Sequence, residues 1–320
     1  MRGIMIRSFS LSFFALCLLG ATLAQAKPPK VAVPVWTDPK KAAAAHPDFK
    51  IQGEYSGEID GKKVGVQVAA LDNDEFHVLT YDGGLPGAGW DSSKIKAEKL
   101  VRSSAQTLTE DLKKVNRKSD TLGKKAPEGA IVLFDGEKTE YIEGTVKDGF
   151  FWSGGKTTQP VGDFHMHAEF RLAYKPGRPL SSQDRGNSGL YIFDNYEIQI
   201  IDTFGLDFDA ANNAIPTESL STQWCGCFYK FKEPDVPMAF PPLAWQTYDI
   251  DFTAPRFIDG EKVVNARITV RHNGVVIHDD VEMATGTGAG AKRPEKEKGL
   301  IIFQDHGNPV AFRNLWLVEK

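Results

Sequence analysis

The clearest pattern in the chain is a pair of apolar runs at 185–205, RGNSGLYIFDNYEIQIIDTFG, in which polar residues recur at alternate positions. Side chains of a strand alternate between two faces, so the runs predict two strands joined by a hairpin turn at Asp194-Asn195. With Phe193 and Tyr196 closing that turn, one face is predicted to be apolar and to pack on a core. Its members are Tyr191, Phe193, Tyr196, Ile198 and Ile200. The opposite face would carry Ser188, Leu190, Ile192, Glu197, Gln199 and Ile201.

Polar side chains gather on this second face. Glu197 and Gln199 lie two positions apart, and Asn187 arrives from the turn before the first run. One β-bulge would turn Asp202 to the same side, because a bulge shifts the alternation by one residue. On a curved sheet such a face can form a cleft. We therefore interpret these residues as a candidate site.

Short strand patterns separated by turn residues continue through the rest of the chain. They lie at 131–134, 144–147, 150–152, 164–172, 245–252, 264–271, 275–281, 300–303 and 310–318. Asn273-Gly274 between two of them is a strong hairpin signal. No long amphipathic helix pattern interrupts the strands, so 129–320 is predicted to be an all-β sandwich or jelly roll. The Pro-rich stretch 234–242 and the Gly- and Lys-rich stretch 284–298 predict long loops, where binding sites often lie.

The first residues have the pattern of a targeting segment. Two arginines precede an apolar run at 11–19, and Ala24-Gln25-Ala26 offers small residues for cleavage. This predicts a signal peptide at 1–26 and an exported protein, periplasmic or extracellular. Cys17 follows Leu16 rather than a small residue, which argues against a lipoprotein anchor. No later stretch is apolar enough to predict a transmembrane segment.

Three further segments separate the signal peptide from the sandwich. Residues 27–47 are rich in Pro and Ala and read as a linker with a short helix at 40–45. Residues 48–90 contain three short strand patterns and predict a small β-meander. Residues 91–128 are polar and Lys-rich and read as a connector, with helical character at 109–118.

Composition narrows the possible partners. The 320 residues are 41% hydrophobic and 25% charged, which is ordinary for a globular protein. A formal net charge of −4 argues against nucleic acid as a partner. After removal of the signal peptide, Cys225 and Cys227 remain, and either a tight local bridge or two buried thiols would fit their spacing. Two cysteines alone do not suffice for a structural zinc site, because such a site needs four ligands.

Four blocks of the sequence carry a resemblance to a known family. IVLFDG, GNSGLYIFDNYEIQIIDTFG, WQTYDIDF and LIIFQDHGNPVAFRNLWL resemble the bacterial 3-keto-disaccharide hydrolase family and occur in that family's order over about 129–320. The resemblance implies a concanavalin A-like jelly roll whose concave sheet binds carbohydrate. It also implies action on 3-keto-glycosides that a separate sugar 3-oxidoreductase supplies. The meander at 48–90 looks like the accessory region of some exported members.

The chemistry of such a substrate suggests roles for individual residues. A ketone at C3 acidifies the hydrogen on C2, so a base can remove it and the C1 substituent can leave, after which water adds. Glu197 and His306 are the candidate proton-transfer pair, with Gln199 and Asp202 beside them. The candidate substrate-binding residues are Arg185, Asn187, Gln304, Asp305 and Trp224. No redox cofactor is expected, although a divalent metal ion held by carboxylate and histidine could stabilise the enolate.

Two other functions fit parts of the pattern. Glu197-x-Gln199-x-x-Asp202 has the spacing of the E-x-D-x-x-E motif of laminarinase-like endo-glucanases, but it departs at two of three positions. A non-catalytic, lectin-like carbohydrate-binding module is the other alternative, because this fold hosts both.

His165 and His167 alternate on one strand and could bind zinc or copper, although a polar sheet face is the commoner explanation.

Overall fold

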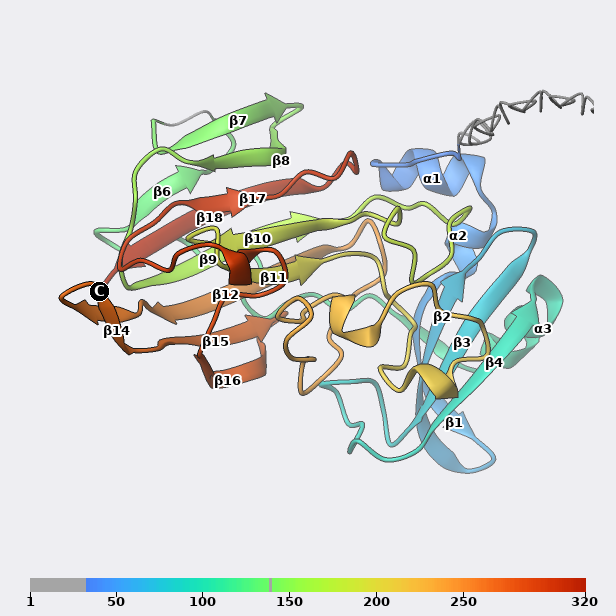
Figure 1. The fold of residues 1–320 in the computed structure, drawn as a ribbon. Helices are drawn as coiled ribbons and strands as arrows, with labels where there is room; N and C mark the ends of the chain where they lie inside the picture. The colour runs from blue at the N-terminus through green and yellow to red at the C-terminus, as the bar shows by residue number, and fades with distance from the viewer. Residues whose placement is uncertain (1–32, 138–139) are drawn as a thin grey trace, which may run out of the picture. The chain divides into compact units, whose positions relative to one another are not determined.

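The computed structural model describes residues 33–137 and 140–320 (Figure 1). The predicted signal peptide at 1–26 and the first residues of the predicted linker lie outside the described residues. Residues 33–320 form one compact unit. None of the helices in the described part of the chain is long and apolar enough to cross a membrane.

The N-terminal part is a five-stranded antiparallel sheet with the strand order β4-β3-β2-β1-β5. Its elements are α1 (Pro39–Ala45), α2 (Asp48–Ile51), β1 (Gly53–Ile59), β2 (Lys62–Ala70), β3 (Glu75–Asp82), β4 (Ile95–Val101), α3 (Arg102–Thr109) and β5 (Lys113–Val115). The predicted meander therefore extends into the segment that the sequence presents as a polar connector. β4 is an edge strand in which Lys96, Lys99 and Val101 are exposed and no residue is fully buried, which explains why its sequence, IKAEKLV, looks polar.

The described part of the predicted linker is packed rather than free. Trp36 and Tyr174 exchange two backbone hydrogen bonds, with N···O distances of 3.0 and 2.9 Å. Helix α1 begins at Pro39, one residue before the predicted start, because the Asp38 carboxylate accepts hydrogen bonds from the N–H groups of Lys40 and Lys41 and Pro39 occupies the first turn. This segment thus joins the N-terminal sheet to the strands that follow it.

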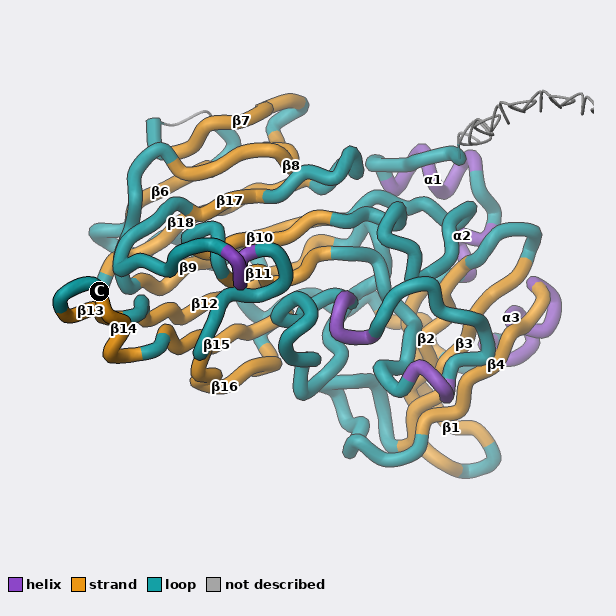
Figure 2. Tube along the Cα trace, viewed as in Figure 1, coloured by secondary structure: helices purple, strands orange, loops and turns teal. Residues whose placement is uncertain are grey.

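The second sheet contains eleven strands among the described residues and is antiparallel throughout its pairings. Its strands are β6 (Ile131–Phe134), β7 (Ile142–Lys147), β8 (Phe150–Thr157), β9 (Phe164–Arg171), β10 (Ser188–Ile192), β11 (Tyr196–Ile200), β12 (Trp245–Thr253), β15 (Ala266–His272), β16 (Val275–Met283), β17 (Ile301–Phe303) and β18 (Ala311–Glu319). A separate ribbon is formed by β13 (Arg256–Ile258) and β14 (Glu261–Val264), and short 3-10 turns lie at Ala210–Asn212, Ser221–Gln223 and Gly290–Lys292. The main path runs β11-β10-β17-β8-β18-β9-β12-β15-β16, and strands dominate this region in Figure 2.

This sheet curls so that its two ends face each other. β8 pairs with β18 through Phe151 and Trp152, and then with β17 through Gly155 and Lys156. A Cβ atom at Gly155 would lie 2.3 Å from the Phe151 ring, so only glycine fits at this bend. Phe252 of β12 contacts Phe193 beside β10, with ring centroids 4.9 Å apart. The predicted jelly-roll sandwich is therefore confirmed.

The register of the β10–β11 hairpin differs by one residue from the prediction. Tyr191 pairs with Glu197 and Ile192 with Tyr196, because the turn places Phe193 and Asp194 at φ of +57° and +63° and leaves Asn195 as one extra residue. Ser188, Leu190 and Ile192 consequently face the core, and the prediction that Tyr191 lies on the apolar face is wrong. The predicted faces of β11 are correct, with Tyr196, Ile198 and Ile200 in the core.

The extra residue of the turn has its own partners. The Asn195 backbone oxygen accepts a hydrogen bond from Thr287 N at 2.8 Å, and its side-chain Nδ2 donates to the backbone oxygens of Gly290 and Arg293 at 3.3 and 3.2 Å. The backbone oxygen and side chain of Asn195 therefore bond with the loop at 284–298, while its N–H closes the turn on the Ile192 oxygen at 3.1 Å. This was not visible in the local alternation of apolar and polar residues.

Candidate active site

The outer faces of β10 and β11 form one wall of a cavity of about 700 Å³. Loops before β10, after β11, before β17 and after β17 complete it, and Figure 1 shows these three strands as neighbours. Its lining residues are Gln183, Asn187, Tyr191, Glu197, Tyr229, Lys230, Gly288, Ala289, Lys292, Gln304 and His306. The volume lies within the range of about 300–1,000 Å³ that is usual for small-molecule sites.

Glu197 is the carboxylate of this cavity. Its side chain is 2% exposed, and its Oε2 accepts a hydrogen bond of 2.7 Å from the Tyr191 hydroxyl. Burial raises the pKa of Glu197 to about 7, although hydrogen bonds from Tyr191 and Gln304 act in the opposite direction. Burial and the neighbouring carboxylate raise the pKa of Tyr191, so its hydroxyl keeps its proton and remains the donor. A carboxyl group with a pKa near neutrality can both take and give a proton.

Space for the Glu197 side chain comes from a missing side chain on the neighbouring strand. A Cβ atom at Gly189 would lie 2.6 Å from Glu197 Oε1 and 3.1 Å from Gln304 Oε1. Gln304 is held in the same place by its backbone, because its N–H donates to the Gly189 oxygen at 2.8 Å and its oxygen accepts from Ser188 Oγ at 2.8 Å. Glycine at 189 thus brings Glu197 and Gln304 together.

The predicted carboxamides of the site occupy two layers. Asn187 lines the cavity, and its Oδ1 accepts a hydrogen bond of 3.3 Å from Gln199 Nε2. Gln199 itself is fully buried, and it also donates to the Gln223 backbone oxygen at 3.1 Å. Gln199 therefore lies behind Asn187 and orients it rather than lining the cavity.

Loops contribute the cationic and aromatic part of the wall. His306 is exposed and lines the cavity, as do Lys230, Lys292 and the half-buried ring of Tyr229. The sequence interpretation missed Tyr191, Tyr229, Lys230 and Lys292 as cavity residues. Lys292 could have been identified from the predicted loop at 284–298. Tyr191 was assigned to the wrong face because the predicted turn was one residue too short.

Arg185 and Asp202 are not part of the cavity, which corrects their predicted roles. Arg185 Nε donates to Asp202 Oδ2 at 2.7 Å, with side-chain exposures of 0% and 1%. The guanidinium also donates to the backbone oxygens of Arg178 and Ala70, at 2.6 and 3.1 Å. These contacts use the charges of both residues inside the protein, so neither is available to a substrate.

Two other predicted substrate-binding residues are also displaced from the cavity. Trp224 is fully buried, packs on Phe208 and donates to Ser219 Oγ at 3.0 Å, so it is not a stacking platform for a sugar. Asp305 is exposed and lies over Gly154, at a different surface depression. The neighbouring thiols of Cys225 and Cys227 are free and buried.

The described residues provide no three-ligand metal site. No group of three or more His, Cys, Asp or Glu side chains in this part of the chain lies together as such a site requires. His167, one of the predicted alternating histidines, is buried, with its Nδ1 2.8 Å from Asp249 Oδ1. Thr121 of the predicted connector donates to the same carboxylate at 2.6 Å, so this histidine belongs to a covered polar network.

Comparison with known proteins places this fold and cavity in a family. The model of the 3-keto-alpha-glucoside-1,2-lyase-like domain matches residues 112–318. The chain belongs to this family. The resemblance drawn from the four sequence blocks is thereby confirmed, and the match begins within the predicted connector rather than at residue 129. No curated protein matches the chain.

Two solved structures are similar to this chain. One protein from Parabacteroides distasonis, named "a putative glycosyl hydrolase", is 33% identical over 61% of this chain and 85% of its own, with a TM-score of 0.50. A second with the same name and organism is 18% identical over 60% of this chain and 95% of its own, with a TM-score of 0.43. The family description and the name of the more similar structure support a glycoside-acting enzyme.

Replacing Asp202 with Asn tests the internal role of the Arg185 pair. Asp202→Asn leaves a buried guanidinium without its counter-charge, so the free energy of unfolding should fall by about 3–5 kcal/mol in guanidinium denaturation. The matched control is Asp194→Asn, which breaks the exposed pair with Arg293 and should cost at most about 1 kcal/mol. Equal losses in the two variants would contradict the internal role.

Adding a methyl group at Gly189 tests the packing beneath the carboxylate. Gly189→Ala drives a Cβ against Glu197 Oε1 and should lower the free energy of unfolding by about 1–3 kcal/mol. Gly162→Ala is the control, because its Cβ would meet nothing closer than 3.7 Å and should change stability by less than about 0.5 kcal/mol. The free energy of unfolding of both variants is measured by chemical denaturation. A value unchanged in Gly189→Ala would show that Glu197 does not occupy this space.

Proposed function

We propose that this protein cleaves 3-keto-glycosides by removing the proton on C2 and expelling the substituent on C1. The observation that carries the proposal is the Glu197 carboxylate, buried in the wall of a sugar-sized cavity, held by Tyr191 and with a pKa of about 7. Family membership supports the substrate, because the family is described as 3-keto-alpha-glucoside-1,2-lyase-like. That description also favours elimination over direct hydrolysis.

The electron flow of the reaction is simple. The C3 ketone withdraws electrons, so Glu197 takes the C2 proton and the C2–H electron pair moves into an enolate. When the enolate carbonyl re-forms, a C1–C2 double bond appears and the C1–O bond breaks, with its electron pair leaving on oxygen. The leaving oxygen takes one proton. Water adding across the new double bond returns a 3-keto-sugar, so the sum is hydrolysis.

Residues of the cavity fit the parts of this reaction. Tyr191 donates to Glu197 Oε2, which orients the carboxylate and leaves Oε1 to receive the proton. The ammonium groups of Lys230 and Lys292 lie in the wall and would stabilise the charge that develops on the C3 oxygen. His306 is the candidate donor to the leaving oxygen. Asn187 and Gln304 supply amide groups for sugar hydroxyls.

A conventional retaining glycosidase mechanism fits this cavity less well. That mechanism uses two carboxyl groups about 5 Å apart on either side of the bond. Glu197 is the single carboxylate among the described residues that line the cavity, and Asp202 is paired with Arg185 in the interior. Elimination next to a ketone requires one such base, so it agrees better with the lining.

The proposed substrate also implies where the protein acts in a sequence of reactions. A 3-keto-glycoside forms by oxidation of a sugar hydroxyl, so a separate oxidoreductase must supply it. The proposed reaction exchanges no electrons with a redox cofactor. The sequence at 1–26 supports export to the periplasm or the exterior, and the substrate would then be a carbohydrate found there.

An assay with matched sugars tests the activity. The purified protein should cleave 3-keto-trehalose and leave unoxidised trehalose intact, with products measured by chromatography. Glu197→Gln should lower the rate about 10²- to 10⁴-fold, because a carboxamide cannot take the C2 proton. Cleavage of trehalose itself would favour a conventional glycosidase, cleavage of the β-glucan laminarin would favour a laminarinase-like endo-glucanase, and binding of either disaccharide without turnover would favour a lectin-like module.

The pH profile tests the state of Glu197. A base must be ionised, so kcat/KM should rise with pH through about 7, the pKa of Glu197. The hydrogen bond from Tyr191 lowers this pKa, so Tyr191→Phe should move the rising limb to higher pH and lower the rate below it. Tyr141→Phe on an exposed tyrosine is the control and should leave the profile in place. If the rising limb of kcat/KM stays at the same pH in Tyr191→Phe, Glu197 is not the group whose ionisation this limb reports.

Stability against pH separates loss of chemistry from loss of folding in Glu197→Gln. The folded-state pKa of Glu197 lies above its ordinary value of 4.5, so ionising it in the folded protein costs free energy as pH rises from about 4.5 through about 7. Glutamine does not ionise, so the stability of Glu197→Gln does not fall in this way as pH rises. Glu197→Gln should therefore match the original protein near pH 4 and be more stable by about 3 kcal/mol at pH 8 in denaturant titrations.

A further inference from the structure

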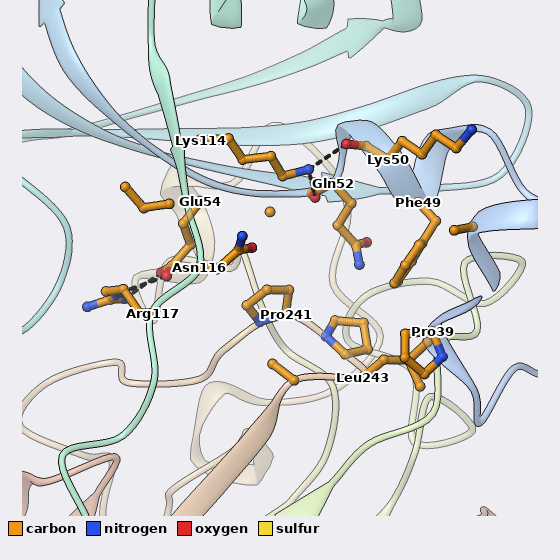
Figure 3. Close-up of a pocket in the computed structure, with 15 residues that line it drawn as sticks. Pro39, Phe49, Lys50, Gln52, Glu54, Lys114, Asn116, Arg117, Pro241 and Leu243 are labelled. Carbon is orange, nitrogen blue, oxygen red and sulfur yellow. Dashed lines mark hydrogen bonds and ion pairs between the residues drawn. The ribbon is translucent and has the colours of Figure 1, made fainter. Parts of the chain in front are cut away.

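A second cavity, of about 410 Å³, shares no lining residue with the catalytic one (Figure 3). One side is formed by the N-terminal part of the chain, through residues of α1 and α2, around the start of β1, and in and just after β5. The other side is the end of the Pro-rich loop, Pro241–Ala244, that leads into β12. Its volume lies within the range of about 300–1,000 Å³ that is usual for ligand sites.

The two sides of this cavity differ in chemistry. Apolar side chains of Pro39, Phe49, Pro241, Pro242 and Leu243 form one surface. Opposite them, Gln52, Glu54, Lys114, Asn116 and Arg117 present polar groups. A ligand that fits both sides has an apolar face and several hydrogen-bonding groups.

Gln52 is the residue that points to a ligand. Its side chain is 4% exposed, and its Oε1 accepts a hydrogen bond of 3.0 Å from Ala70 N. That bond fixes the amide and leaves Nε2 buried without a partner. In Figure 3 this amide is directed toward the proline side of the cavity. A buried donor without an acceptor costs free energy, so a ligand that places an oxygen at this point would be bound more tightly.

The charged groups of the cavity are already engaged. Arg117 Nε donates to Glu54 Oε2 at 2.7 Å, which neutralises both. Lys114 Nζ donates to the backbone oxygens of Lys50 and Gln52, at 2.5 and 2.7 Å. Burial of this ammonium end lowers the pKa of Lys114 to about 8, although much of the side chain is exposed. Lys50 extends away from the cavity in Figure 3, so the fitting ligand is neutral.

We propose that this cavity is a second carbohydrate site that binds one monosaccharide ring. The C–H face of the ring would pack on Phe49 and the prolines. An oxygen of the sugar would accept from Gln52 Nε2, and a hydroxyl would bond with the Asn116 amide. The N-terminal sheet would then have a binding function of its own. This inference uses no property of the catalytic cavity and does not depend on the proposed reaction.

Binding of simple sugars tests the proposal directly. The ¹⁵N-labelled protein is titrated with D-glucose, D-galactose and D-mannose while the side-chain amide signal of Gln52 is followed by NMR. Sodium acetate at matched ionic strength is the anionic probe. At least one sugar should shift the Gln52 signal saturably, and acetate should not. No saturable shift with any of the three sugars, or saturation by acetate instead, would overturn the proposal.

Neighbouring alanines of α1 provide a matched pair of variants. Ala43 lines the cavity, so Ala43→Phe fills it and should weaken sugar binding at least tenfold. Ala44 is exposed and does not line the cavity, so Ala44→Phe should leave the affinity unchanged. Asn116→Ala is a second test that remains usable if Ala43→Phe does not fold, because Asn116 is exposed. It should weaken sugar binding severalfold. Affinity unchanged in both Ala43→Phe and Asn116→Ala would place the sugar elsewhere and overturn the proposal.

Discussion

The register of the β10–β11 hairpin is the constraint on which the site depends. A slip of one residue exchanges the two faces of a strand, so it would move Tyr191 from Glu197 into the core. The register is held by Asn195, which leaves the ladder to bond with Thr287, and by Thr287 Oγ1, which accepts from Glu197 N at 2.8 Å. The hydrogen bond between Tyr191 and Glu197 is therefore a consequence of how the turn is anchored.

Local patterns predicted what depends on local alternation. The sandwich followed from short alternating runs and strong turns, and the core face of β11 followed from Tyr196, Ile198 and Ile200. The turn at 193–195 was assigned one residue too short, because its extra residue is stabilised by a loop about ninety positions away in the sequence. β4 was missed because this edge strand has no fully buried residue and therefore has a polar sequence.

Site residues were harder to predict than strands, since a polar residue type does not reveal its partner. Glu197 and Asp202 lie five positions apart and are both buried, yet their surroundings differ. Asp202 meets the guanidinium of Arg185 and becomes part of the structure. Glu197 meets a neutral hydroxyl and an open cavity, so its charge is poorly compensated and its pKa rises to about 7. Only their tertiary contacts distinguish the role of Glu197 from that of Asp202.

The loop at 284–298 links the geometry of the turn to the composition of the cavity. Gly290 lies so close to Asn195 that a Cβ atom there would be 2.1 Å from the Asn195 oxygen, and Lys292 follows two residues later in the cavity wall. The same contact that holds the strand register thus brings a cation to the cavity that Glu197 occupies. Thr287 and Gly290 are constrained by these contacts, whereas Lys292 is exposed. Replacement of Lys292 would therefore change the charge of the cavity wall without altering the contacts that hold the strand register.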